Sequence, residues 1–469
     1  MDFSNAAIEQ LITPSDERCA CGRPHRTGLS FVRIGPGATR AVPEALAGAG
    51  IAHPFIVCDE NTYRAAWPAL EPILRENGIQ FTLHILRGTH HHQNGRTENA
   101  RILPDERTEN AHIIPDERTV GALCMAFTPP SDGILAVGSG VICDCCKVLA
   151  NAARVPCVVY ATAPSMDGYA SDSSSMIRDR IKVTLYNACP SAIVADIDII
   201  RSAPMRMLWA GLGDMLAKYV SLCEWRIAHI VTGEYFCENI AGLMRAALQR
   251  IRQNAERLTS RNPDAVQAVT EGLVLSGIAM SFAKVSQPAS GLEHYFSHMW
   301  EMMALERGKP HDLHGIQVGC GTVLTLKLYE KIRKIQPSRE KAEAFIEAFD
   351  TKAWEAQMRD IFGSAAEAII GKEKSEYHKN DPEGHAKRVA AIIANWPEIL
   401  RAIDEELPPA EELLRLARML GMPITPEELG IPGEDVRKAF IGSREIRDKY
   451  IASSLLWDLG GLYETDILE

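Results

Sequence analysis

The chain has 469 residues, of which 46% are hydrophobic and 24% are charged, and its formal net charge is −11. These proportions are typical of an ordinary globular protein, and the length predicts two or three domains with large cores. A nucleic-acid-binding face is normally basic, so the acidic surplus argues against a nucleic-acid partner. A small anionic substrate would need a locally positive pocket.

The sequence also restricts where we expect the protein to work. The N-terminus lacks the basic-then-apolar order of a secretory signal, and no uncharged apolar run reaches the length of about 18 residues that suggests a membrane helix. Twelve cysteines are scattered along the chain, far below the density of a disulfide scaffold. We therefore predict a cytoplasmic protein with reduced thiols and no membrane insertion.

The first 200 residues alternate short, β-branched apolar runs with helical patterns. Strands are predicted at 55–58, 81–86, 134–137, 155–161 and 193–197, and helices at 62–76 and 141–153. Such alternation predicts a parallel sheet flanked by helices, so we assign residues 1–202 to an α/β dinucleotide-binding domain.

An eleven-residue phrase is repeated inside this first domain. Residues 97–107 read TENARILPDER, and residues 108–118 read TENAHIIPDER. Two copies do not make a solenoid, and their polar composition predicts a duplicated surface loop at 97–118. A functional lid is the alternative.

Strand signals fade after about Pro204. Amphipathic stretches at 240–258, 265–284 and 315–335 predict an all-α second domain, residues 203–469, and turn residues at 202–204 mark the boundary.

Two features of the first domain indicate a dinucleotide. The strand at 134–137 runs into Gly138-Ser139-Gly140 and then a helix, and glycines there let the backbone approach a pyrophosphate at the helix start. A lone GxG is weak evidence, because such turns are common without a ligand. Asp59 ends another strand, where its carboxylate could accept hydrogen bonds from an adenosine ribose or could simply cap the next helix.

A third polar loop follows the strand at 155–161. It reads ATAPSMDGYASDSS, in which Thr162, Ser165 and Ser171 offer hydrogen-bond donors and Asp167 an acceptor. The plainer interpretation is a surface turn rich in glycine and serine. Loops that follow several parallel strands meet at one edge of the sheet, which is where ligands bind in such folds.

The second domain contains a possible metal site. Asp214 ends the phrase AGLGD, and His294 and His298 are four residues apart, so on a helix they share a face; His314 follows. One carboxylate and two or three imidazoles suit a borderline divalent metal with an open position. The alternative is ordinary helix histidines and a capping aspartate.

Two groups of cysteines have separate interpretations. Cys19, Cys21 and His25 offer three soft ligands within seven residues, but a structural zinc normally needs a fourth, and none is near in the sequence. Cys143, Cys145 and Cys146 lie too close together on the predicted helix for a regular four-ligand site.

Taken in order, several phrases make the chain resemble the sn-glycerol-1-phosphate dehydrogenases, bacterial branch, within the superfamily of dehydroquinate synthase and iron-containing alcohol dehydrogenases. The matching phrases are VGSGVICDCCK, YATAPSMDGYAS, APMRMLWAGLGDMLAK, GLEHYFSHMWE, HGIQVG and IRDKYIASSLLWDLG. The resemblance implies a dehydroquinate synthase-like fold, with an α/β nucleotide-binding domain followed by an all-α domain.

The resemblance also implies roles for particular residues. Asp214, His294 and His314 would hold one divalent metal ion, and Asp167, Asp214 and His298 would touch the substrate. The NAD or NADP cofactor would be contacted by Asp59, Gly140, Val141, Ile142, Cys143, Asp144, Thr162, Ala163, Pro164, Ser165 and Ser171.

The implied reaction is reduction of dihydroxyacetone phosphate to sn-glycerol 1-phosphate, in a homodimer or larger homo-oligomer. The metal could be zinc, nickel or iron, since these ligands accept all three, and Lys147 and Lys182 are candidates for binding the phosphate. Three alternatives are a glycerol or other polyol dehydrogenase, a dehydroquinate synthase and a non-catalytic metabolite-binding relative.

Overall fold

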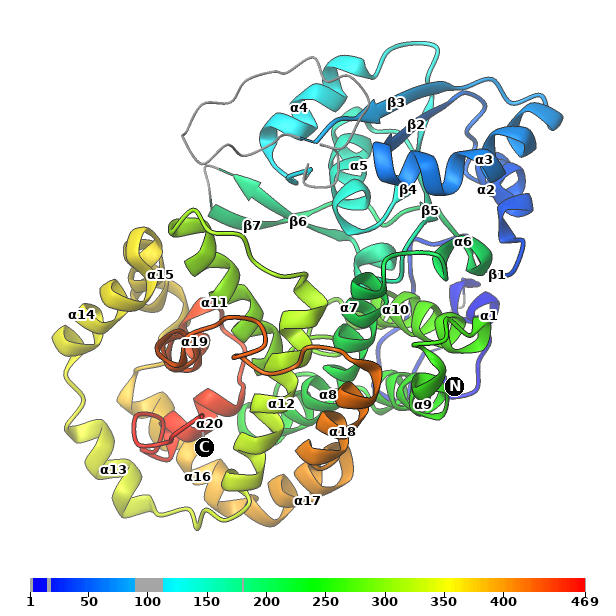
Figure 1. Cartoon of the computed structure of the whole chain (residues 1–469). Coiled ribbons are helices and arrows are strands. Elements are labelled where there is room, and N and C mark those ends of the chain that lie inside the picture. Colours follow the sequence, from blue (N-terminus) through cyan, green and yellow to red (C-terminus); the bar gives the residue numbers. More distant parts are fainter. Residues whose placement is uncertain (1–2, 15–17, 89–112, 179–180, 469) are drawn as a thin grey trace.

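The computed structural model describes residues 3–14, 18–88, 113–178 and 181–468. The first part of the chain forms a six-stranded sheet in the order β1-β8-β5-β4-β2-β3, and all neighbouring strands are parallel. The strands are β1 Phe31–Gly35, β2 Pro54–Asp59, β3 Thr82–Leu86, β4 Gly133–Gly138, β5 Cys157–Ala161 and β8 Ala192–Asp196. A helix-rich part follows, which confirms the predicted fold class (Figure 1).

Helices cover both faces of the sheet because alternate residues of each strand point to opposite sides. Helices α2 (Val42–Gly48) and α3 (Glu60–Glu76) pack on one face, in the hydrophobic cluster that includes Ile56 and Leu135. Helix α5 (Gly140–Ala153) packs on the other face, in the cluster that includes Phe55 and Ile134. The connections that follow β2 and β4 therefore leave on opposite sides of the sheet, and the ends of strands at such a point are where ligands bind in folds of this kind.

Two strand regions were not predicted. Strand β1 lies at the sheet edge, and its short apolar run is interrupted by Arg33, whose side chain is exposed. Strands β6 (Ser173–Arg178) and β7 (Ile181–Tyr186) form an antiparallel hairpin outside the main sheet. Its first strand begins with three serines, which are poor strand formers, so composition gave no signal.

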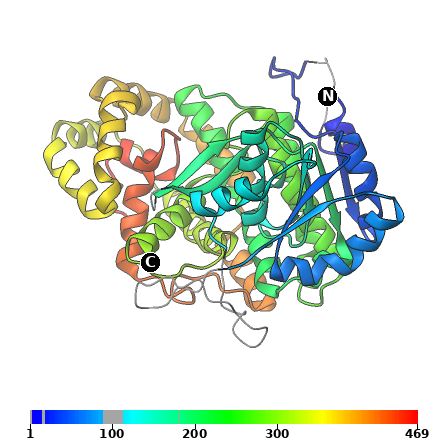
Figure 2. The same cartoon turned by 90° about the horizontal axis from the view of Figure 1, so that it is seen from above.

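The rest of the chain is helical over the described residues. Short helices α1 (Ile8–Ile12) and α6 (Ile197–Ile200) flank the sheet part. The later helices are α7 Met205–Leu216, α8 Lys218–Thr232, α9 Glu238–Asn254, α10 Pro263–Ala283, α11 Leu292–Glu306, α12 His314–Ile332, α13 Arg339–Glu347, α14 Thr351–Phe362, α15 Ala366–Lys372, α16 Pro382–Ala394, α17 Trp396–Glu406, α18 Ala410–Leu420, α19 Gly433–Ile446 and α20 Ala452–Asp458. Figure 1 shows α7 and α10 next to the sheet part and α13, α14 and α16 far from it, and Figure 2 gives the view from above.

Helix α10 is a core helix. It is the one helix of the described chain that is long and apolar enough to cross a membrane, but 78% of that apolar window is buried inside the molecule. Burial of this kind is typical of the central helix of a globular protein, and α10 packs against α7 and α9.

The duplicated segment lies mostly outside the described residues, which resume at Ile113. The end of its second copy is not loop: Asp116 accepts a hydrogen bond from the Thr119 amide and caps helix α4 (Glu117–Ala126), which therefore begins inside the repeat. The predicted loop at 97–118 thus extends too far by at least the two residues that start this helix.

Deletion of residues 108–118 is expected to leave the protein folded and active. The first copy ends in the same PDER sequence, so Asp105 would then occupy the capping position before Thr119. We expect a change in the free energy of unfolding of less than about 1 kcal/mol. Thermal unfolding and steady-state kinetics check this. A joint change of kcat and KM at constant melting temperature would instead indicate a lid.

Candidate active site

The carboxyl ends of three neighbouring strands carry the residues expected to bind the dinucleotide. Strand β4 lies between β2 and β5, and Gly138 pairs with Ala161 at the end of β5. Asp59 ends β2, the Ser139-Gly140 turn follows β4, and Thr162 follows β5. The three predicted loops therefore meet at one edge of the sheet.

The start of α5 presents backbone amides rather than side chains. Its N-cap residue is Ser139, and no capping hydrogen bond from that side chain is found within the described part of the chain. The side chains of Ile142 and Cys143 are buried, so these residues can reach a ligand only through the backbone. A Cβ atom at Gly138 would lie 2.5 Å from the Ile142 side chain, so glycine is required for the turn to pack this tightly. Free amides at a helix start favour an anion such as a pyrophosphate.

Asp144, the fifth residue of α5, is engaged within the protein. Its carboxylate accepts a hydrogen bond from the Ser175 amide at 3.0 Å and pairs with the Lys147 ammonium at 2.9 Å. The Lys147 ammonium also donates to the carbonyls of Gly168 and Ser173. These three partners use all three protons of the buried Lys147, so this lysine anchors the loop after β5 and is not available to a phosphate.

Asp59 is a helix cap in this structure. One carboxylate oxygen accepts hydrogen bonds from the amides of Asn61 (2.8 Å) and Thr62 (2.7 Å) at the start of α3. The capping role is therefore observed, and a role at the cofactor ribose stays a prediction beside it.

Replacing Asp59 with serine is expected to raise the ratio of kcat/KM for NADPH to that for NADH, because the carboxylate would repel a ribose 2′-phosphate. Serine retains helix-capping ability, so stability should change by less than about 1 kcal/mol. Asp350→Ser, at the cap of α14, is the matched control and should leave cofactor preference unchanged. An unchanged ratio in Asp59→Ser would leave Asp59 as a cap alone.

Hydrogen bonds between its own residues hold the loop after β5 in place. The Tyr169 hydroxyl donates to the Ala163 carbonyl at 2.5 Å, and the Ser171 hydroxyl donates to the Ser173 carbonyl at 3.0 Å. Thr162 and Ser171 are buried, whereas Ser165 is half-buried. Of the hydroxyls expected to face the cofactor, that of Ser171 is therefore already committed to the loop.

A buried lysine joins this loop to the helical part. The Lys218 ammonium lies 2.8 Å from the Asp167 carboxylate and 3.0 Å from the Asp214 carboxylate. The Asp167 amide donates to Asp214 at 2.9 Å, and the Ser276 hydroxyl of α10 donates to Asp167 at 2.8 Å. Asp167 and Asp214, predicted from separate phrases, therefore meet around one cation.

The charges in this group stabilise one another. Burial opposes ionisation of Asp214, but Lys218 and His294 outweigh it and hold the pKa of this carboxyl well below its usual range. Burial likewise disfavours the charged lysine, yet Asp167 and Asp214 raise the pKa of Lys218 above its ordinary value. The site thus keeps the Asp214 carboxylate ionised although it is buried away from bulk water.

His294, on α11, faces the same aspartate. Its Nε2 lies 3.3 Å from Asp214 Oδ1, and its Nδ1 lies 2.8 Å from the buried Glu293 carboxylate. Burial lowers the pKa of His294, but the hydrogen bonds to Asp214 and Glu293 outweigh that effect and raise it. When Nδ1–H donates to Glu293, the Nε2 lone pair points at a carboxylate oxygen. The raised pKa places a proton at Nε2 that these two atoms share, and a metal ion bound by both atoms would replace that proton.

His314 begins α12, and its ring centroid lies 5.4 Å from that of His294. Its Nδ1 lies 3.1 Å from the Glu301 carboxylate, and the His298 ring stacks on it at 5.5 Å. In the part of the chain that the structure describes, ligand atoms of His298, Glu301 and His314 lie within 4.8 Å of one another. The predicted ligand His314 thus belongs to a second group of possible ligands and also lies beside His294.

The pKa shifts of His298 and Glu301 involve a different lysine, Lys182, from the shift of Asp214. Burial, followed by Lys182 and His314, holds the pKa of His298 well below its usual value, so its imidazole is neutral. Burial would raise the pKa of Glu301, but its ion pair with Lys182 and its contact with His314 lower it. The Nδ1 atom of His298 has no hydrogen-bond partner among the residues described. A neutral imidazole with a free ring nitrogen can pass on a proton.

Glycines in two of the quoted phrases bring these helices together. A Cβ atom at Gly315 would lie 2.0 Å from the Ala210 carbonyl oxygen, and one at Gly213 would lie 2.2 Å from the Gly315 carbonyl oxygen. One at Gly211 would lie 1.8 Å from the Pro164 carbonyl oxygen, in the loop after β5. The AGLGD and HGIQVG phrases therefore allow α7 to contact both α12 and the loop.

Sequence reasoning missed Lys218, Ser276, Glu293 and Glu301. Helical spacing contained a signal for two of them. Lys218 lies four residues after Asp214, at the start of the next helix, and Glu301 lies three after His298 on α11, so each has helical spacing from a predicted site residue. Ser276 lies on another helix, and no sequence spacing connects it to Asp167.

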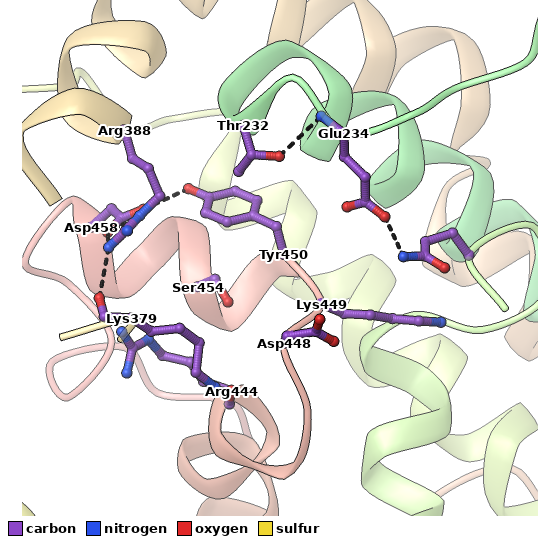
Figure 3. Close-up of a pocket in the computed structure, with 11 residues that line it drawn as sticks. Thr232, Glu234, Lys379, Arg388, Arg444, Asp448, Lys449, Tyr450, Ser454 and Asp458 are labelled. Carbon is purple, nitrogen blue, oxygen red and sulfur yellow. Dashed lines mark hydrogen bonds and ion pairs between the residues drawn. The ribbon is translucent and has the colours of Figure 1, made fainter. Parts of the chain in front are cut away.

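A hollow in the helical part of the molecule is separate from the predicted site residues. Its volume is about 370 Å³, and it is lined by residues of the α8–α9 connection, α16 and the segment from α19 to α20 (Figure 3). Arg388 pairs with Asp458 at 2.9 Å, and the Tyr450 hydroxyl donates to the same carboxylate. None of the predicted site residues lines this hollow, and its charges are largely paired, so we assign it no part in the chemistry.

Comparison with known proteins agrees with this geometry. The family model described as iron-containing alcohol dehydrogenase matches residues 33–204. A solved structure of a probable glycerol dehydrogenase from Sinorhizobium meliloti aligns over 92% of this chain and 93% of its own, with a TM-score of 0.56 and 16% identity. An NADH-dependent butanol dehydrogenase from Thermotoga maritima aligns over 92% and 93%, with a TM-score of 0.55 and 13% identity. At this identity the likeness defines the fold class, that of the iron-containing alcohol dehydrogenases.

Sequence relatives narrow the class to one family. A protein named glycerol-1-phosphate dehydrogenase [NAD(P)+], from Halalkalibacterium halodurans, is 34% identical over 70% of this chain and 76% of its own length. A protein of the same name from Pyrococcus furiosus is 38% identical over 46% of this chain and 62% of its own. The chain belongs to the glycerol-1-phosphate dehydrogenase family and is an oxidoreductase.

Proposed function

We propose that this enzyme catalyses the reversible, NAD(P)H-dependent and metal-dependent reduction of dihydroxyacetone phosphate to sn-glycerol 1-phosphate. The observation that carries the proposal is the group formed by the buried Asp214 and His294 with the half-buried His314, joined through Lys218 to the loop after β5. The names of the sequence relatives support the same substrate.

The residues present fit a catalytic metal ion. One carboxylate and two imidazoles suit zinc, nickel or iron(II) and leave a position open for a substrate oxygen. One ring nitrogen of His294, Nε2, faces Asp214 Oδ1, and the other, Nδ1, contacts the Glu293 carboxylate. This is the arrangement of a metal-binding histidine that a carboxylate orients. Asp214, His294 and His314 would therefore hold the ion.

Each protein group then has a defined task. When bound, NAD(P)H supplies a hydride, and the metal polarises the ketone oxygen. Lys218 keeps Asp214 ionised and, through its ion pair with Asp167, fixes the loop that carries Asp167, which would accept a hydrogen bond from a substrate hydroxyl. His298, neutral and with a free ring nitrogen, would relay a proton to the reduced oxygen.

The dinucleotide would lie across the ends of β2, β4 and β5. The amides of residues 140–144 would bind its pyrophosphate, and residues 162–165 would contact the nicotinamide end. Lys182, which pairs with Glu301 beside His298, remains a candidate for the substrate phosphate, because its side chain is partly exposed.

The test is NADH oxidation by the purified enzyme after its metal has been removed and zinc, nickel or iron(II) returned. We expect turnover with dihydroxyacetone phosphate that depends on the metal, and kcat/KM at least about 100-fold lower with dihydroxyacetone, since a bound phosphate contributes charge-assisted hydrogen bonds. Product chirality is measured by failure of sn-glycerol-3-phosphate dehydrogenase to oxidise it.

Equal activity on dihydroxyacetone would point to a polyol dehydrogenase instead. Full activity without metal, or a product of the opposite chirality, would overturn the proposal as stated.

A further inference from the structure

Four metal-ligating side chains meet where the N-terminal segment reaches the helical part. Cys19, Cys21 and His25 come from that segment, and Cys237 is the residue immediately before α9. One ligand atom from each lies within 4.8 Å of the other three. The fourth ligand that could not be found near the motif in the sequence is therefore supplied from 218 residues away.

The spacing of these atoms fits a tetrahedral zinc ion. The distances are 3.7 Å from Cys19 Sγ to Cys237 Sγ, 3.4 Å from Cys21 Sγ to His25 Nε2, and 3.6 Å from Cys237 Sγ to His25 Nε2. Zn–S bonds of about 2.3 Å and Zn–N bonds of about 2.0–2.1 Å at tetrahedral angles place two sulfurs about 3.8 Å apart and a sulfur and nitrogen about 3.6 Å apart.

The surroundings orient the histidine as a metal ligand. Its Nδ1 lies 3.2 Å from the Phe282 carbonyl, to which Nδ1–H can donate, so the Nε2 lone pair faces the sulfurs. The ring also stacks on the Phe282 ring, with centroids 5.5 Å apart. This is the outer-sphere arrangement usual for a metal-binding imidazole.

The cysteines have matching support. The Asn239 side-chain amide donates to Cys19 Sγ at 3.0 Å, which favours a thiolate. From Cys19 to Gly22 the chain makes a tight turn in which the Gly22 amide donates to the Cys19 carbonyl, and Gly22 has φ of +80°. Cys19 and Cys237 are buried, while Cys21 and His25 are half-buried, so an ion can enter from the solvent side.

We propose that Cys19, Cys21, His25 and Cys237 bind a structural zinc ion, separate from the catalytic metal. Four protein ligands close the coordination sphere, which is typical of structural zinc and leaves no position for a substrate. The ion fastens the N-terminal segment to the start of α9 and, through His25, to the end of α10 (Figure 1). Helix α10 also carries Ser276, the hydrogen-bond donor to Asp167.

The test counts metal and identifies its ligands in the full-length protein. Zinc is measured by mass spectrometry of the purified enzyme and of His294→Ala, which lacks a catalytic ligand. We expect one zinc per chain to remain in His294→Ala. Substitution with cobalt(II) should give an intense near-ultraviolet thiolate-to-cobalt charge-transfer band together with tetrahedral visible bands. The catalytic residues include no thiolate, so this band reports the cysteine site whether or not the catalytic proposal holds.

Variants of the cluster complete the test. Cys237→Ser in the His294→Ala background should lose the remaining zinc and the charge-transfer band, and its melting temperature should fall. Cys21→Ser, at a more exposed ligand, serves where Cys237→Ser does not fold. Cys124→Ser, an exposed cysteine on α4, is the matched control and should retain both signals.

Absence of zinc and of the cobalt band from the reduced, zinc-supplemented His294→Ala protein would overturn the proposal. So would a Cys19–Cys237 disulfide, detected in freshly purified protein as two thiols that alkylate only after reduction.

Discussion

His294→Ala is expected to abolish turnover and to reduce bound metal by one ion per chain. The substitution removes one of the three proposed protein ligands, and it also removes the imidazole that both Glu293 and Asp214 contact. Loss of Lewis-acid stabilisation amounts to several kcal/mol, so kcat/KM should fall by at least about 1,000-fold. Steady-state kinetics and metal analysis of the same preparation measure both effects.

His298→Ala is the matched comparison, because His298 lies one helical turn further along α11. Loss of a proton relay should lower turnover by roughly 100- to 10,000-fold while the metal stays bound. If metal content fell as far as in His294→Ala, the ion would instead belong to the neighbouring group of His298, Glu301 and His314.

Gly315→Ala is expected to destabilise the protein strongly and to impair the site. The new Cβ atom would lie 2.0 Å from the Ala210 carbonyl oxygen, which belongs to helix backbone and has little freedom to move. Helices α7 and α12 would have to separate, which moves Asp214 away from His314. We expect a loss of about 1–3 kcal/mol in the free energy of unfolding, measured by denaturant titration, together with weaker binding of the catalytic metal.

Gly371→Ala provides the control for this experiment. Gly371 also lies in a helix, α15, but a methyl group added there would have no described atom within 4 Å outside its own helix backbone and chain neighbours. Alanine there should stabilise the protein by about 0.5–1 kcal/mol, because it restricts the unfolded chain and favours the helix. Equal effects of the two substitutions would show that helix propensity, rather than close packing, explains the Gly315 result.

The fold was predictable where a strand or helix has a strong local signal. Buried parallel strands such as β4 are continuous apolar runs, and helix α9 is a long amphipathic stretch, so both were found from the sequence. Strand β1, with an arginine at its centre, depends on its pairing with β8 and was missed. Its strand conformation comes from a neighbour more than 150 residues away.

The candidate site shows the same division. Asp214 and His294 belong to phrases that could be recognised, and the structure brings them to 3.3 Å. Lys218 was not singled out, because only the folded loop supplies the second carboxylate that makes burial of this lysine favourable. The sequence did not connect Cys237 with Cys19, because spacing rules for zinc ligands apply only to cysteines and histidines that are close together in the sequence.

The contacts of the N-terminal segment have a consequence for synthesis on the ribosome. Cys19 meets Cys237 and His25 meets Phe282, so these early residues find their partners only after more than 200 further residues have been made. At an elongation rate of about 5–20 residues per second, that delay is roughly 10–50 seconds. The sheet can pair its strands as far as β8 in the meantime, while the segment with Cys19 and His25 still lacks its partners. The N-terminal segment is therefore synthesised first but is one of the last parts of the chain to reach its native contacts.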